Sequence, residues 1–238
     1  MLCLSLVYRG EWINQLYMEG EKMPQSITGL KIPNSRMALA ARSLIRDAET
    51  ELLYNHSHRV FAFGCLTATR LGIAVDRELL YIGALFHRAG LTDAFRSSHL
   101  RFEVDGANAA AEFLTSYGVR EASVQEVWDA IALHTTPGIA VHKTPLVALL
   151  TRGVETDTIV LHVRDFTDEQ KRQVIGAFSR GDRFKEQIIE ALGAGMLHRP
   201  ETTFGTVNAD ILDRVDPNYR RKNFCGLILG SDAFDSYC

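Results

Sequence analysis

The most constraining feature of this chain is the apolar run LLYIGALF at positions 79–86. The run is apolar on all sides, which is typical of a helix buried by its neighbours rather than of a surface helix. Elsewhere apolar residues recur every three to four positions, and convincing two-residue alternation is scarce. The sequence therefore predicts an all-α fold with residues 79–86 in a central helix.

Capping and breaking residues predict where the helices begin and end. Asn34 or Ser35 is a suitable cap for a first helix that covers MALAARSLIRDAETELL. Glycine and proline separate the segments that follow. Further helices are expected at roughly 56–72, 76–90, 103–117, 121–134, 144–153, 168–178 and 182–197. The one candidate strand is Thr158–Val163.

The length of 238 residues suits one compact domain with additions at its ends. We expect an N-terminal extension at 1–33, a helical domain at 34–198 and an irregular C-terminal tail at 199–238 that packs on the domain. The opening MLCLSLVY is short and lacks a basic leader, so no signal peptide is expected. No apolar run reaches the roughly 20 residues of a membrane span, so we expect a cytoplasmic protein without a membrane partner.

Charge and cysteine usage exclude further classes. The formal net charge of -3 is the wrong sign for a protein that coats nucleic acid. The one dense basic cluster, Arg220–Lys222, is interpreted as a solvated turn near the C-terminus. The four cysteines form no C-x-x-C pair, which predicts neither a zinc knuckle nor a disulfide scaffold.

Two of the eight histidines stand in distinctive surroundings. His56 lies in NHSHRV, and His87 follows the buried run in FHRAGLTD. Downstream come RFEVDGANAAAEFL, VWDAIALHT and LVALLTRGVETD. In this order and spacing, from about Ile27 to Asp157, the chain resembles the HD-domain superfamily and, within it, the cyanamide hydratase-like branch. The resemblance implies an HD-domain-like helical bundle.

The resemblance also implies a metal site. Carried over to this sequence, the ligands of a divalent metal become His56, His87 and Asp157, while the aspartate of the His-Asp pair falls on Arg88. Such ligands suit zinc, iron or manganese, and a metal-held water is a nucleophile at neutral pH. The implied chemistry is hydrolysis of a phosphate ester, or addition of water to a nitrile-like carbon, in a small-molecule substrate.

Arg88 puts that ligand set in question. Two histidines and one carboxylate can still hold a catalytic metal, because three protein ligands suffice. A guanidinium has no lone pair to donate, and its charge repels a dication. If Arg88 points away from the centre, metal binding is weakened; if it points inward, it can fork onto Asp157 and take the metal's place.

Other polar residues near these motifs are candidates for contact with substrate. Asp93 could orient water or substrate, which makes it the candidate catalytic residue. Thr92, His134 and Thr135 follow helix ends and, with Arg88, are candidate substrate-binding residues.

Three functional hypotheses follow. The first is a cyanamide hydratase-like metal-dependent hydrolase or hydratase, impaired by the missing aspartate. The second is a nucleotide or phosphomonoester phosphohydrolase that recruits Arg88, Arg96 and Arg101 for phosphate. The third is a metal-free HD-like protein that binds a partner or a small ligand. Homo-oligomerisation stays open in all three.

Overall fold

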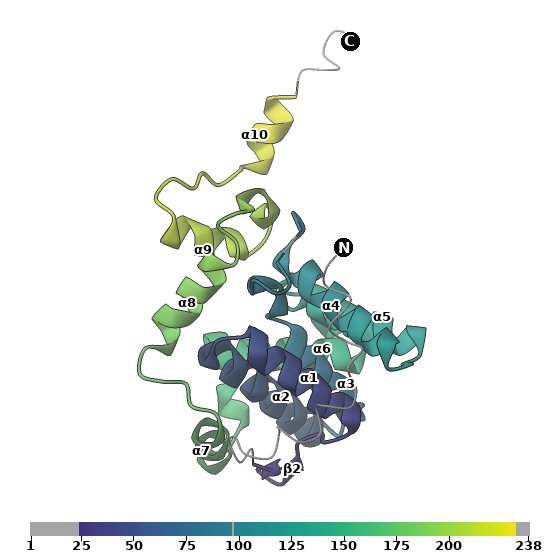
Figure 1. Ribbon diagram of the computed structural model, residues 1–238. Helices are drawn as coiled ribbons and strands as arrows, with labels where there is room; N and C mark the ends of the chain where they lie inside the picture. Colours follow the sequence, from purple (N-terminus) through teal and green to yellow (C-terminus); the bar gives the residue numbers. More distant parts are fainter. Residues whose placement is uncertain (1–23, 97, 232–238) are drawn as a thin grey trace.

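The computed structural model describes residues 24–96 and 98–231, and helices dominate this part of the chain (Figure 1). Two short strands, β1 (Ser26–Ile27) and β2 (Leu30–Lys31), pair in antiparallel register. The helices are α1 (Arg36–Ala48), α2 (Glu51–Leu71), α3 (Arg77–Phe86), α4 (Phe102–Ser116), α5 (Glu121–Leu133), α6 (Pro145–Ile159), α7 (Asp168–Ala177), α8 (Phe184–Ala194), α9 (Asn208–Val215) and α10 (Phe224–Leu229). Short 3₁₀ turns are η1 (Ala89–Leu91), η2 (Ala140–His142), η3 (Val163–Asp165) and η4 (Pro200–Thr203). The predicted all-α class is confirmed.

The boundary between α1 and α2 differs from the prediction. The first helix ends at Ala48 rather than continuing through LL, and α2 begins five residues earlier than the expected position 56. The reason is Thr50, whose hydroxyl accepts a hydrogen bond from the Leu53 amide and caps α2. Such a cap satisfies an amide that the first helical turn leaves without a partner.

The predicted strand at Thr158–Val163 is wrong. Helix α6 runs through Gly153 to Ile159, and the chain then turns at Val160 and His162, which have φ values of 58° and 68°. This left-handed backbone ends the helix and cannot continue as a strand. The apolar residues that suggested a strand are on the surface instead, with Ile159 64% exposed.

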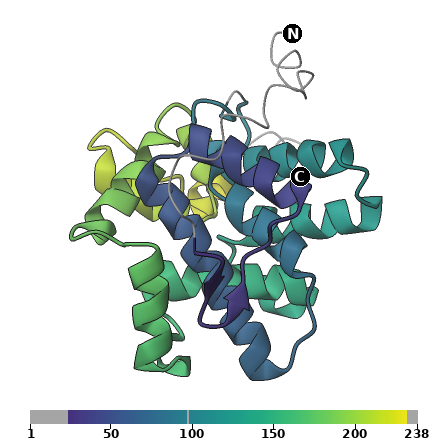
Figure 2. The ribbon, with the colours of Figure 1, turned by 60° about the horizontal axis from the view of Figure 1, so that its bottom comes forward.

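The core of the fold is built around α2 and α3. All of 79–86 is buried, as the sequence predicted, and α2 is buried over almost the whole of 53–68. Helix α2 packs most extensively against α6, and α4 and α5 pair along one side of the body (Figure 1). The view in Figure 2 brings β1 and β2 forward, and β2 contacts α2.

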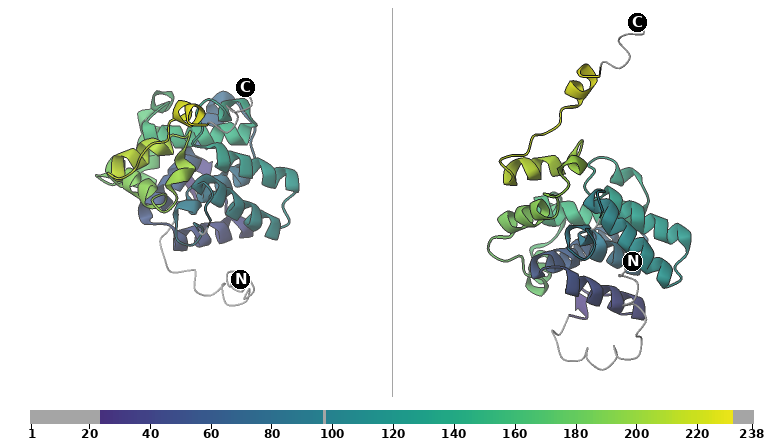
Figure 3. Two further views of the ribbon diagram at one scale, coloured as in Figure 1. Left: turned by 90° about the horizontal axis from the view of Figure 1, so that it is seen from above. Right: turned by 45° about the horizontal axis from the view of Figure 1, so that its top comes forward.

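The predicted C-terminal tail is only partly irregular. Helices α8 and α9 contact each other, and Phe184, Ile188 and Leu212 form a second apolar cluster with Leu91 and Phe102. Helix α10 instead stands away from the body at the end of an extended segment (Figure 3). The predictions for residues 1–23 and for the last residues of the tail lie outside the described residues.

Among the described residues, none of the helices is both long enough and apolar enough to cross a bilayer.

The close approach of α2 and α6 gives a first prediction. A Cβ added at Gly153 would lie 2.3 Å from the Val60 carbonyl oxygen, so Gly153→Ala forces the two helices apart. We expect a loss of about 2 kcal/mol or more in the free energy of unfolding, measured by urea denaturation. Gly176→Ala in α7 is the matched control, because a Cβ there meets nothing within 4 Å. It should raise stability by up to about 1 kcal/mol, and equal effects of the two substitutions would contradict the packing account.

Candidate functional site

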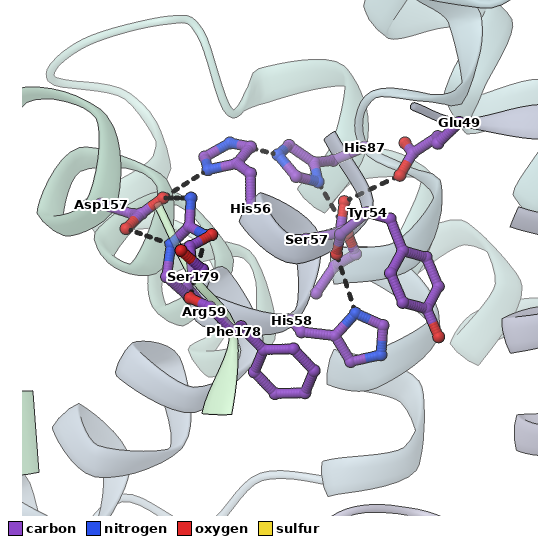
Figure 4. A network of polar contacts seen from close by, with 11 residues as sticks. Glu49, Tyr54, His56, Ser57, His58, Arg59, His87, Asp157, Phe178 and Ser179 are labelled. Atoms are coloured by element: carbon purple, nitrogen blue, oxygen red, sulfur yellow. Dashed lines mark hydrogen bonds and ion pairs between the residues drawn. The ribbon is translucent and has the colours of Figure 1, made fainter. Parts of the chain in front are cut away.

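The candidate site lies where α2 and α6 pack together. His56 and Arg59 are one helical turn apart on α2, and Asp157 faces them from α6. All three side chains have no exposed surface. Figure 4 shows these residues in a chain of polar contacts that runs from Arg59 through Asp157 and His56 to His87.

Both oxygens of Asp157 are engaged by nitrogen donors. Arg59 donates from Nε to Oδ1 at 2.8 Å and from Nη2 to Oδ2 at 2.9 Å. His56 donates from Nδ1 to the same Oδ2 at 2.7 Å. The third nitrogen of Arg59, Nη1, donates to the carbonyls of Phe178 and Ser179 at 3.2 and 2.8 Å. The carboxylate therefore lies in a two-pronged ion pair with a second donor beside it.

Two further histidines reach the centre from helix ends. His87 follows α3 and donates from Nδ1 to the Ala84 carbonyl at 2.7 Å. His134 follows α5 and makes the equivalent bond to the Ile131 carbonyl at 2.6 Å. A carbonyl can only accept, so each neutral ring carries its proton on Nδ1 and keeps the Nε2 lone pair free. The two rings meet edge to face with centroids 5.0 Å apart.

The rings of His56 and His87 converge more closely. Their Nε2 atoms are 3.2 Å apart, and the ring centroids are separated by 5.1 Å. The structure thus brings together the three residues that the resemblance implied as ligands: His56, His87 and Asp157. It does so with Asp157 on the Nδ1 side of His56 and His87 on its Nε2 side.

Arg88 is buried in the same region, with 2% of its surface exposed. Its guanidinium lies 5.7 Å from the centre of the Phe102 ring and interacts with the charges of Glu103, Glu49 and Asp157. Its Nε atom has no hydrogen-bond partner among the described residues. Arg88 therefore points inward, but the guanidinium that forks onto Asp157 belongs to Arg59.

Glu103 is the centre of a neighbouring polar cluster. Arg101 donates to it at 3.0 Å, Asn208 donates at 2.8 Å, and the Thr135 hydroxyl also donates to it. The Glu103 side chain is fully buried, and its carboxylate holds together residues before α4, after α5 and in α9. The Thr135 hydroxyl therefore uses its proton in a hydrogen bond to Glu103.

The remaining sequence candidates, Asp93 and Thr92, make contacts of their own. The Asp93 side chain is 87% exposed and forms an ion pair with Arg96. The Thr92 hydroxyl donates to the Ala89 carbonyl at 2.8 Å, which closes the turn after η1. Asp93, the candidate for orienting water or substrate, thus faces solvent, whereas His56 and His87 are buried.

Sequence reasoning missed Arg59 and Glu49. Arg59 stands three residues after His56 on a helix that is apolar on nearly all sides, and a buried guanidinium requires a carboxylate. The arginine could be seen in the motif NHSHRV, but the sequence did not show which carboxylate would pair with it. Glu49 follows α1, accepts a hydrogen bond from Ser57 at 3.4 Å and has its other oxygen buried without a partner among the described residues.

Burial and charge shift the ionisation of every group in the centre. Burial lowers the pKa of His56 to about 4 against the opposing influence of Asp157. Burial, followed by the charge of Arg88, lowers the pKa of His134 to about 3 and that of His87 well below its usual value. Burial also lowers the pKa of Arg88 to about 10, which leaves it a cation at neutral pH.

The carboxylates respond in opposite directions. Burial alone would raise the pKa of Asp157, but the His56 and Arg59 donors hold it well below its usual value. Burial would also raise the pKa of Glu103, yet the hydrogen bond from Arg101 keeps it lowered. Burial raises the pKa of Glu49 well above its usual value, even with Arg88 nearby.

The comparison with protein families agrees with this architecture. The HD domain family model matches residues 53–172, half of the chain, so the protein belongs to the HD-domain family. This family lies within a superfamily of metal-dependent hydrolases whose members typically bind divalent metals. The search of curated proteins returned no match.

The residues present do not fit the family's metal. Of its four ligand positions, one is Arg88, and a second is Asp157, whose oxygens are both bound to donors. In residues 24–96 and 98–231, no group of three or more histidine, cysteine or acidic side chains is placed to hold a metal ion. What survives of the ligand set is the pair of Nε2 atoms of His56 and His87.

The ion pair between Arg59 and Asp157 yields a prediction on stability. Arg59→Met leaves a buried carboxylate without its main partner, which should cost about 3–5 kcal/mol in the free energy of unfolding. Removing both charges in Arg59→Met/Asp157→Leu should recover a large part of that loss. Urea denaturation of the two single variants and the double variant gives the coupling energy. Strictly additive losses would show that the two side chains do not stabilise each other.

The buried histidines yield a prediction on pH. Their folded-state pKa values lie below the unfolded value of about 6.5, so the neutral form is favoured in the folded protein. Stability should therefore fall as pH drops from 6.5 toward 4, with each histidine contributing at most about 1.4 kcal/mol per pH unit. Glu49, with a raised pKa, acts in the opposite direction but is one group against several.

The test is urea denaturation of wild type and His134→Leu between pH 7.5 and 5. Leucine removes the titrating group and also the hydrogen bond from His134 Nδ1 to the Ile131 carbonyl. The loss of that bond lowers stability at every pH, so the change in slope reports the titration. The variant should show a shallower loss of stability at acid pH. Identical slopes would mean that His134 is not held neutral in the folded protein.

Proposed function

We propose that this chain is a non-hydrolytic member of the HD-domain family, whose centre is closed by ion pairs and which acts by binding at its surface. The single observation that carries the proposal is the engagement of Asp157 by Arg59 through two hydrogen bonds. That contact uses the carboxylate that the family's metal would need.

Three features support a metal-free centre. The Asp157 carboxylate already accepts three hydrogen bonds, one from His56 and two from Arg59. A metal at Asp157 would compete with the buried Arg59 guanidinium for the same carboxylate, and loss of that ion pair is costly. Arg88 adds a second buried cation at the position of the family's paired aspartate. A dication would then meet two fixed positive charges.

The two remaining nitrogen ligands are well placed but too few. Nε2 atoms 3.2 Å apart can both reach one ion at about 2.1 Å, and both tautomers leave the lone pairs free. Catalytic sites nevertheless use three protein ligands. The centre is thus one carboxylate short of a metal site, and Arg88 occupies the position that could supply it.

The hydratase and phosphohydrolase hypotheses both need a nucleophilic water made at a metal, so the same features speak against both. Arg88 is buried beside Glu103 and Glu49 and does not present a phosphate-binding surface. Asp93 faces solvent. No observation favours cyanamide or a nitrile as substrate beyond the sequence resemblance.

The proposal predicts that metal binding can be created by one substitution. Arg88→Asp removes the cation and supplies a carboxylate next to His87, so the purified variant should gain close to one equivalent of zinc or manganese. Wild type should contain far less than one. Elemental analysis after dialysis against each metal measures this. Arg88→Leu is the matched control, because it removes the charge without adding a ligand, and it should stay metal-poor.

A second control ties the gained metal to the histidines. His87→Ala in the Arg88→Asp background should abolish the gain. One equivalent of metal in wild type, lost in His87→Ala, would overturn the proposal and restore the metallohydrolase hypothesis. In that case, assays with nitriles, cyanamide and nucleotides would separate the hydratase from the phosphohydrolase.

A further inference from the structure

A cavity of about 240 Å³ lies between η4 and the segment 216–222 that follows α9. None of the residues that line it belongs to the centre around His56 and Asp157. Figure 1 shows α9 on the side of the molecule that carries the C-terminal segments. The volume is below the roughly 300–1,000 Å³ of pockets that hold drug-sized ligands, so the cavity suits a smaller molecule.

Hydrogen bonds hold the two walls of this cavity in place. Thr203 donates its hydroxyl proton to the Pro200 carbonyl at 2.7 Å, so the Tyr219 hydroxyl donates to Thr203 at 2.8 Å and joins the walls. In the second wall, the Tyr219 amide donates to the Asp216 carbonyl at 3.0 Å. The Asn218 amide donates to the Asp216 carboxylate at 2.8 Å. A site that already has its shape loses less freedom when a ligand enters.

Four charged side chains of both signs line the cavity. They are Glu201, Asp216, Arg220 and Lys222. Among the described residues, none of the four takes part in an ion pair. Arg220 donates from Nη1 to two backbone carbonyls rather than to a carboxylate. The cavity therefore offers two negative and two positive groups to a ligand.

Two aromatic rings supply the apolar part of the lining. Phe204 is 39% exposed, and the hydroxyl bond to Thr203 holds the ring of Tyr219 in place. Aromatic rings pack favourably against other aromatic rings in offset or edge-to-face arrangements. A ligand that satisfies the whole lining thus carries one positive group, one negative group and one aromatic group.

We infer that this cavity is a binding site for a free aromatic α-amino acid. The ammonium group of the ligand pairs with the two carboxylates, its carboxylate pairs with the two basic side chains, and its ring packs against the two aromatic side chains. The inference rests on the proposed function, since it names what the surface of this protein binds. Its test measures a ligand and does not involve the metal content of the centre.

Ligands with a single charge satisfy only half of this lining. A small anion such as phosphate attracts Arg220 and Lys222 but is repelled by the two carboxylates. An organic cation attracts Glu201 and Asp216 but is repelled by the two basic side chains. A zwitterion gives both signs a partner, and such complementarity determines which ligand a site selects.

The test is isothermal titration calorimetry of the full chain with L-phenylalanine, L-tyrosine and L-tryptophan. At least one of them should bind with a stoichiometry of one. Two analogues of that amino acid identify the charged contacts: the amide lacks the carboxylate, and the N-acetyl derivative lacks the ammonium group. Each analogue should bind roughly tenfold more weakly or worse, because it leaves two charged side chains without a partner.

Substitutions in the lining assign the binding to this cavity. Glu201→Gln and Lys222→Gln each remove one of two partners of a ligand group and should raise the dissociation constant roughly 3- to 10-fold. Arg221→Gln is the matched control, because Arg221 stands between the two basic lining residues but pairs with Asp210 instead. This variant should bind like wild type. All three positions are exposed, so urea denaturation should show unchanged folding.

Several results would overturn the inference. They are the absence of binding by all three amino acids at millimolar concentrations, equal binding of the amide and N-acetyl analogues, and wild-type affinity in both lining variants. Binding of phosphate alone would make the cavity an anion site, and binding of tetramethylammonium alone would make it a cation site. Metal in the wild-type protein would contradict the proposed function but would leave these titrations unchanged, so the two failures are distinguishable.

Discussion

The buried ion pair between Arg59 and Asp157 is the interaction on which the centre of this protein depends. It joins α2 to α6, the helices that pack most extensively, and the remaining nitrogen of Arg59 ties the carbonyls of Phe178 and Ser179 to the same point. Burying a guanidinium and a carboxylate is tolerated only when every donor and lone pair finds a partner. Here each of the three Arg59 nitrogens has one. The pair thus fixes the position of His56 through Asp157.

The buried charges of the centre are the physical basis for proposing that it holds no metal. Arg59 and Arg88 are cations, while Asp157 and Glu103 are held ionised by their donors. Burial raises the pKa of the Glu49 carboxyl well above its usual value. Asp157 is already paired with Arg59 and Glu103 with Arg101, so Arg88 is a further positive charge in the same region. An added dication would leave excess positive charge in a region without solvent, where it is most costly.

The sequence predicted the class of fold because helical periodicity is local and readable. The expectation that His56, His87 and Asp157 converge came from the resemblance to the HD-domain superfamily. The sequence predicted much less about what those residues do. Whether Arg88 or another arginine reaches Asp157 depends on the packing of α2 against α6, which no local pattern encodes. The start of α2 was also predicted incorrectly: the Thr50 hydroxyl caps the helix, which therefore begins at Glu51 rather than at position 56. The strand predicted at Thr158–Val163 was wrong because apolar composition alone does not distinguish a strand from the end of a helix.

The most direct measurement is anomalous X-ray diffraction from crystals grown with excess zinc, recorded at the zinc absorption edge. The account predicts no anomalous peak between His56 and His87, with the Arg59 guanidinium still on Asp157. A peak about 2.1 Å from both Nε2 atoms, with Asp157 turned from Arg59 toward the ion, would contradict it.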